Sequence, residues 1–120
     1  MTKSNLVRFA LLGVFAILLA QTSLAGEIDG TWHFIFSTDE AEYPREVVIT
    51  TKGDQAVAKI GEDTFKGAFK DNKLELAGDL YADEAGYTAE FKIKGELAEG
   101  KLKGTATWDT YDLTFTATKK

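Results

Sequence analysis

Few residues in this chain could do chemistry, and their spacing argues against catalysis. Beyond residue 25 the sequence has one histidine, His33, and one serine, Ser37, and there is no cysteine anywhere. Four residues apart on an extended strand, their Cα atoms would lie roughly 13 Å apart. A nucleophile and its base must be within hydrogen-bond reach, so these two cannot form such a pair. We therefore expect no enzymatic activity, no catalytic residues and no cofactor, and we interpret His33 as an outward-facing strand residue.

Carboxylates are plentiful, with 19 Asp and Glu against 14 Lys and Arg. Loop carboxylates can bind Ca²⁺, but no segment has the spacing of a known calcium loop, so we interpret them as solvated side chains and expect no metal. An acidic chain has no basic surface with which to neutralise phosphates, which argues against nucleic acid and anionic lipid as partners. The partners left are a small-molecule ligand or a secreted protein.

The first 25 residues have the layout of a secretory signal peptide. Lys3 and Arg8 provide a positive start, an apolar run follows, and small residues precede Gly26. We expect cleavage after Ala25, leaving residues 26–120 as a single domain that is secreted or periplasmic and has no membrane attachment. An uncleaved N-terminal anchor is the alternative. Without the two leader cations the mature chain has 12 basic and 19 acidic residues, a net charge of −7.

The remaining chain alternates apolar and polar residues with a period of two, which is typical of one-faced β-strands. Two-residue turns at 53–54, 62–63, 71–72, 99–100 and 109–110 would each pair flanking residues of the same face. Longer links are expected at 38–44 and 81–86, with Pro44 just before a strand. The predicted strands lie near 31–37, 45–52, 55–61, 64–70, 73–80, 87–98, 101–108 and 111–118. Eight sequential antiparallel strands favour an all-β up-and-down barrel, because closure removes both sheet edges, and a two-sheet β-sandwich is the alternative.

Hairpins in sequence order alternate between the two ends of such a barrel, so both long links fall at one end, which is acidic and aromatic. Five residues near that end have inward parity and form the predicted ligand site: Phe36, Arg45, Tyr87, Trp108 and Tyr111. Apolar rings would supply most of the affinity, and Arg45 could anchor the carboxylate of a mostly apolar ligand. Alternatively, Arg45 pairs with Glu42 or another loop acid and caps the core.

Two short patterns resemble a known family. Asp29-Gly30-Thr31-Trp32 opens the first strand, and Leu102-x-Gly104-x-Ala106-x-Trp108 forms the seventh. Together with the meandering strands they resemble the calycin-type barrels, lipocalins and avidins, and most of all the small secreted bacterial lipocalin-like barrels. The resemblance implies that Trp32 closes the narrow, short-turn end. It does not extend to biotin binding, since residues 34–36 are apolar where avidins place polar groups.

Two functions are compatible with these features. One is a secreted, non-enzymatic barrel that binds a small apolar or aromatic ligand at the long-loop end. The other is a filled barrel that acts through its surface as a protein-interaction module, such as a periplasmic protease inhibitor. A cavity that admits a small molecule would favour the first function, whereas a packed interior with an exposed aromatic patch would favour the second.

Overall fold

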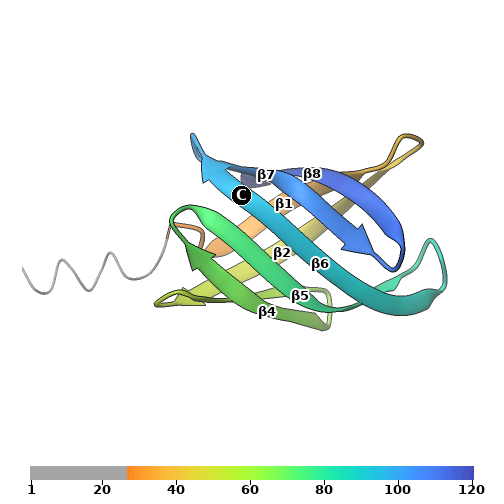
Figure 1. Ribbon diagram of the computed structural model, residues 1–120, viewed down its shortest axis with the longest axis horizontal. Helices are drawn as coiled ribbons and strands as arrows, with labels where there is room; N and C mark the ends of the chain where they lie inside the picture. Colours follow the sequence, from red (N-terminus) through yellow and green to blue (C-terminus); the bar gives the residue numbers. More distant parts are fainter. Residues whose placement is uncertain (1–26) are drawn as a thin grey trace, which may run out of the picture.

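The computed structural model describes residues 27–120, which form eight antiparallel β-strands (Figure 1). The predicted leader and its cleavage site lie outside these residues. Nothing in the described part of the chain is a helix long and apolar enough to cross a membrane. The strands are β1 (Gly30–Ser37), β2 (Glu42–Lys52), β3 (Gln55–Ile60), β4 (Asp63–Lys70), β5 (Lys73–Ala82), β6 (Tyr87–Ala98), β7 (Lys101–Trp108) and β8 (Tyr111–Lys119).

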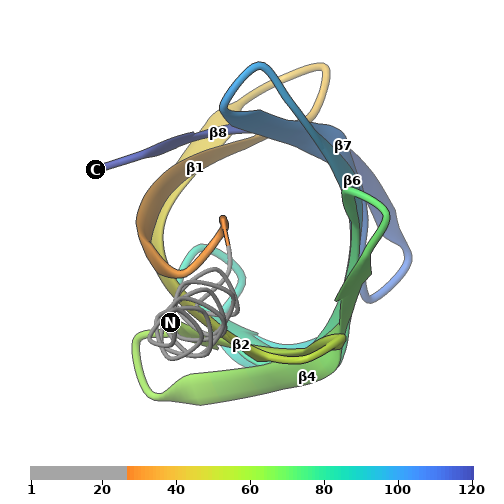
Figure 2. The same ribbon diagram turned by 90° about the vertical axis from the view of Figure 1, so that its left-hand side faces the viewer.

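The strands close into a barrel in which each strand pairs with its neighbours in sequence. Closure is made by β8 returning to β1, in a register that runs from Trp32 opposite Lys119 to Ser37 opposite Thr114. Figure 2 looks along the barrel from the short-turn end and shows the continuous wall. The predicted up-and-down barrel is therefore confirmed, and the two-sheet sandwich is excluded.

Four of the five predicted two-residue turns have the expected register. The prediction at 62–63 was wrong: Ile60 pairs with Asp63, so the turn is Gly61-Glu62. Gly61 has φ +62°, a left-handed conformation that tight hairpin turns need and that glycine adopts without strain. The register moves by two residues, which leaves every side chain on its predicted face.

The second strand begins earlier than predicted, at Glu42, and Pro44 lies inside it opposite Ile35. The prediction that Pro44 precedes the strand was wrong because this part of β2 has a neighbour on one side only. Pairing of β2 with β3 starts at Val48, so Pro44 stands on an open edge, where a missing N–H costs no ladder hydrogen bond. The long links shorten to 38–41 and 83–86.

Aromatic rings fill the middle of the barrel. Phe34 stacks on Phe115 with centroids 5.0 Å apart, Phe36 meets the edge of Phe91 at 5.2 Å, and Phe65 meets Phe91 at 5.7 Å. All five rings are at least 97% buried. Burying each one stabilises the fold by about 1.5–3 kcal/mol. The middle is thus a packed core, not an open channel.

The short-turn end is closed by Trp32 and by the residues that precede β1. Trp32 is 1% exposed, and its indole N–H donates a 2.8 Å hydrogen bond to the carbonyl of Ile28, which is itself fully buried. Gly30, with φ +134°, lets the chain turn from this plug into β1. In Figure 2 the first described residues turn inward across the barrel opening. Trp32 therefore lies where the resemblance implied.

Candidate functional site

A cavity of about 280 Å³ opens at the long-loop end of the barrel. Its lining is mostly apolar. Its charged side chains, Arg45 and Glu84, belong to the rim, by which we mean the residues around the opening of the cavity. The lining residues come from β1, β2, β5, β6, β7 and β8 and from the links at 38–41 and 83–86: Phe36, Thr38, Tyr43, Arg45, Leu80, Ala82, Glu84, Ala85, Phe91, Trp108, Tyr111 and Leu113. The cavity lies directly above the phenylalanine core, because Phe36 and Phe91 belong to both.

One wall of the cavity is the indole of Trp108, which is 7% exposed. Its N–H donates a 2.9 Å hydrogen bond to the carbonyl of Leu80, so the only polar atom of the ring is satisfied by the protein. Tyr111 stacks on the indole at 6.1 Å with 16° between the planes, and Tyr87 packs at 4.8 Å. The three rings form a fixed apolar surface beside the opening.

Tyr87 is held from outside the cavity. Its hydroxyl donates a 2.6 Å hydrogen bond to the carboxylate of Asp109. That hydrogen bond, with desolvation and the negative charge of Asp109, raises the pKa of Tyr87 to about 12, because each disfavours the phenolate. Tyr87 therefore acts as a neutral donor that fixes the Asp109 turn against the aromatic rim.

An ion pair spans the opposite side of the mouth. Nη2 of Arg45 lies 2.7 Å from both carboxylate oxygens of Glu84, and Nη1 donates to the carbonyl of Pro44 at 2.9 Å. The hydrogen bond from Arg45 lowers the pKa of Glu84, so this carboxyl is ionised at neutral pH. The pair joins β2 to the β5–β6 turn, two elements that the β3–β4 hairpin separates in the barrel wall. This is the alternative expected for Arg45, with Glu84 as the loop acid.

The structure brings the five predicted site residues to one end, although their role in binding stays a prediction. Phe36, Arg45, Trp108 and Tyr111 line the cavity, whereas Tyr87 lies behind Trp108 and does not. Sequence reasoning missed several other lining residues, among them Leu80, Ala82, Glu84, Phe91 and Leu113. Inward parity was available for all of these except Glu84, which lies in a turn without periodicity.

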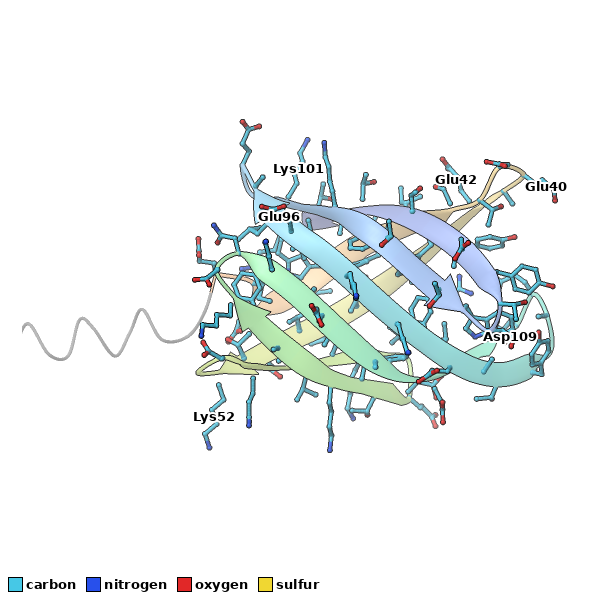
Figure 3. The ribbon with its side chains drawn as sticks, viewed as in Figure 1. Glu40, Glu42, Lys52, Glu96, Lys101 and Asp109 are labelled. Carbon is cyan, nitrogen blue, oxygen red and sulfur yellow. The ribbon has the colours of Figure 1, made fainter. Side chains whose placement is uncertain are left out.

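Charge is distributed unevenly between the two ends of the barrel (Figure 3). The turns of the long-loop end and the strand residues flanking them hold eight acids and no Lys or Arg: Asp39, Glu40, Glu42, Glu62, Asp63, Asp83, Glu84 and Asp109. The same count at the short-turn end gives three acids, Asp54, Asp71 and Glu99, with four lysines, Lys52, Lys70, Lys73 and Lys101. The cavity therefore opens into a negative field.

The two residues considered for catalysis lie on a single strand. His33 lies on the outer face of β1 and is exposed, and the partly buried Ser37 is four residues further along the same strand. Among residues 27–120 no group of three or more His, Cys, Asp or Glu side chains is placed to hold a metal ion. What the end offers a ligand is an apolar hollow with an aromatic wall and a charged rim.

The fold and the cavity define the class of protein: a closed eight-stranded antiparallel β-barrel with an apolar hollow at its long-loop end. Comparison with protein-family models, curated proteins and solved structures finds no match.

Proposed function

We propose that the mature chain is a secreted or periplasmic, lipocalin-like binding barrel, not an enzyme, and that it holds a small apolar or aromatic ligand at the long-loop end. The observation that carries the proposal is the 280 Å³ cavity above the phenylalanine core. Small-molecule sites range from roughly 300 to 1,000 Å³, so this volume suits a small ligand.

The pairing of the polar groups around the cavity supports an apolar ligand. The Trp108 N–H is bonded to Leu80, and the Thr38 hydroxyl is engaged within its own loop with Ala41. Arg45 and Glu84 are bonded to each other. A ligand would therefore gain its affinity by burying apolar surface against Phe36, Trp108 and their neighbours.

Tryptophan fluorescence tests the proposal directly. The chain has two tryptophans, so in a Trp32→Phe protein the emission comes from Trp108 alone. Titration with a fatty acid, a flavonoid-like aromatic and a neutral sugar should change the emission for at least one of the first two probes and leave it unchanged for the sugar. If no probe perturbs Trp108, the cavity is not a ligand site.

A filled cavity should abolish the response. Ala82 lines the hollow near the end of β5, and Ala77 on the same strand is exposed on the outer face. In the Trp32→Phe background, Ala82→Phe should weaken probe binding by tenfold or more, an estimate of about 1.4 kcal/mol from lost cavity volume. Ala77→Phe adds the same ring outside and should leave binding unchanged. Equal effects of both substitutions would contradict the assignment of the site.

The second candidate is the protein-interaction module, such as a periplasmic protease inhibitor. It is favoured by three exposed tyrosines, Tyr81, Tyr87 and Tyr111, with exposed fractions of 49%, 43% and 57%. Aromatic residues are enriched at protein interfaces. A barrel that binds none of the probes but inhibits a secreted protease, and loses inhibition with Tyr111→Ala, would establish this function in place of ligand binding.

A further inference from the structure

The charge of the ligand can be inferred from the charged residues around the mouth of the cavity. This inference rests on the proposed function. We propose that the cavity takes a cationic amphiphile, with its apolar part inside the barrel and an ammonium head at the acidic mouth. Three observations carry this: the engagement of Arg45 by Glu84, the one-sided charge of the mouth, and exposed aromatic rings beside it.

Among residues 27–120, the only cation that lines the cavity is Arg45, and Glu84 already neutralises it. Both oxygens of Glu84 lie 2.7 Å from Nη2 of Arg45, and the side chains are 23% and 43% exposed. An anionic head would have to displace Glu84 and leave that carboxylate beside the ligand's own charge. An uncharged or cationic head leaves the pair intact. The rim thus gives no advantage to an anion.

The surrounding field favours a cation. Apart from Glu84, the acids of the long-loop turns form no salt bridge in the described part of the chain. Asp39, Glu40, Asp83 and Asp109 therefore have no cationic side chain paired with them at the opening. Charges of this kind act over about 8 Å at physiological ionic strength. In Figure 3, Glu40, Glu42 and Asp109 gather at this end of the barrel, away from Lys52 and Lys101.

Aromatic faces at the mouth complete the site for an ammonium head. Tyr111 lines the cavity, is 57% exposed and stacks on Trp108, which forms the cavity wall. Cations are attracted to ring faces within about 6 Å of the centroid. A head group held there would have carboxylates and ring faces around it while its chain extends toward Phe36 and Phe91.

The test compares three probes that share one chain and differ in head group: decyltrimethylammonium, decanol and decanoate, each below its micelle concentration. Binding to Trp32→Phe protein is followed by Trp108 emission at about 0.01 M and about 0.15 M salt. At low salt we expect the ammonium to bind about three- to tenfold tighter than decanol and decanoate to bind more weakly than decanol. The advantage of the ammonium should shrink at the higher salt.

Two substitutions and a matched control locate the effect. Glu84→Gln removes the partner of Arg45, so decanoate should tighten and the ammonium should weaken, each by about two- to threefold, with decanol unchanged. Asp109→Asn removes a negative charge at the mouth without freeing Arg45, so it should weaken the ammonium and tighten decanoate, with decanol unchanged. Glu96→Gln removes the same charge at the opposite end (Figure 3) and should alter no affinity.

The outcomes separate this inference from the proposed function. If none of the three probes binds, the ligand-binding function itself fails. If decanol binds but the ammonium binds no tighter at low salt, the function stands and the charge inference is overturned. Tightest binding of decanoate to the unsubstituted rim would likewise overturn it and establish Arg45 as an anion anchor. An equal loss of ammonium binding in Glu96→Gln would show that the net charge of the protein, not the mouth, attracts the cation.

Discussion

Replacing Trp32 with alanine tests how the short-turn end of the barrel is closed. The indole is 1% exposed and provides the one hydrogen bond that ties the buried Ile28 plug to β1. The substitution would therefore remove a ring from the packed end and one of the three side-chain hydrogen bonds that hold residues 27–29. Both effects destabilise the folded state.

The size of the effect follows from these two losses. Truncating a buried Phe or Trp to alanine costs about 3–5 kcal/mol, and an unsatisfied buried carbonyl at Ile28 adds about 1 kcal/mol or more. Small domains have a total stability of about 5–15 kcal/mol. Trp32→Ala should thus remove much of the stability, whereas Trp32→Phe keeps most of the ring, loses the donor and should cost about 1–2 kcal/mol.

Urea and thermal unfolding followed by circular dichroism would measure the change. For a domain of this size each kcal/mol lowers Tm by about 4–8 °C, so Trp32→Ala should lower it by more than about 12 °C. Tyr81→Ala serves as the control, because this tyrosine is 49% exposed and its loss should cost less than about 1 kcal/mol. Equal losses for Trp32→Ala and Tyr81→Ala would refute the closed end.

Three further predictions concern the wall, the rim and the leader. Gly104→Ala would place a Cβ 1.9 Å from the backbone carbonyl oxygen of Lys94, which cannot rotate away. Overpacking typically costs roughly 1–3 kcal/mol, and urea unfolding should show a loss of stability of at least this size. In an alkaline absorbance titration, one of the four tyrosines should ionise near pH 12, because the hydrogen bond from Tyr87 to Asp109 holds the phenol neutral, and Tyr87→Phe should delete that late phase. Since the folded-state pKa is raised above the ordinary 10.0, the stability that this bond adds is complete below about pH 10 and lost as the pH rises through about 12. The intact mass of the exported protein should correspond to cleavage after Ala25, and a species retaining Thr2 would contradict the leader assignment.

The sequence predicted the barrel well because two independent signals agree along it. The period-two pattern sets the face of each side chain, and the two-residue turns set which residues pair. The one wrong turn, at Gly61-Glu62, left the faces intact because the error was two residues. The early start of β2 was missed because a proline normally marks a strand boundary, whereas Pro44 sits on an edge that β3 does not reach.

The site was predicted only in part, for a physical reason. Parity identifies inward residues on strands, so it found Phe36, Arg45, Trp108 and Tyr111. It could not show that Tyr87 would pack behind the indole of Trp108. That contact depends on how the start of β6 lies in space relative to the end of β7. Nor could it select Glu84 as the partner of Arg45, since the conformation of a four-residue link has no periodic signature.

The unequal lengths of the strands explain why the cavity lies at this end. Beyond the β3–β4 hairpin, β2 continues over Glu42–Val47 without β3, and β5 continues past Ala77 without a paired residue in β4. Figure 1 shows the β5–β6 end extending well past the end of β4. Inward residues on these extensions, such as Tyr43 and Ala82, lack a neighbouring strand on one side, are only partly buried against the core and line the hollow. Arg45 and Glu84 join the two extensions beyond the β3–β4 hairpin. An ion pair therefore closes this part of the wall, whereas backbone hydrogen bonds close the rest. A partly exposed ion pair of this kind contributes little to stability, about 0–1 kcal/mol. The same pair that occupies Arg45 thus completes the wall where β2 and β5 lack a neighbouring strand between them.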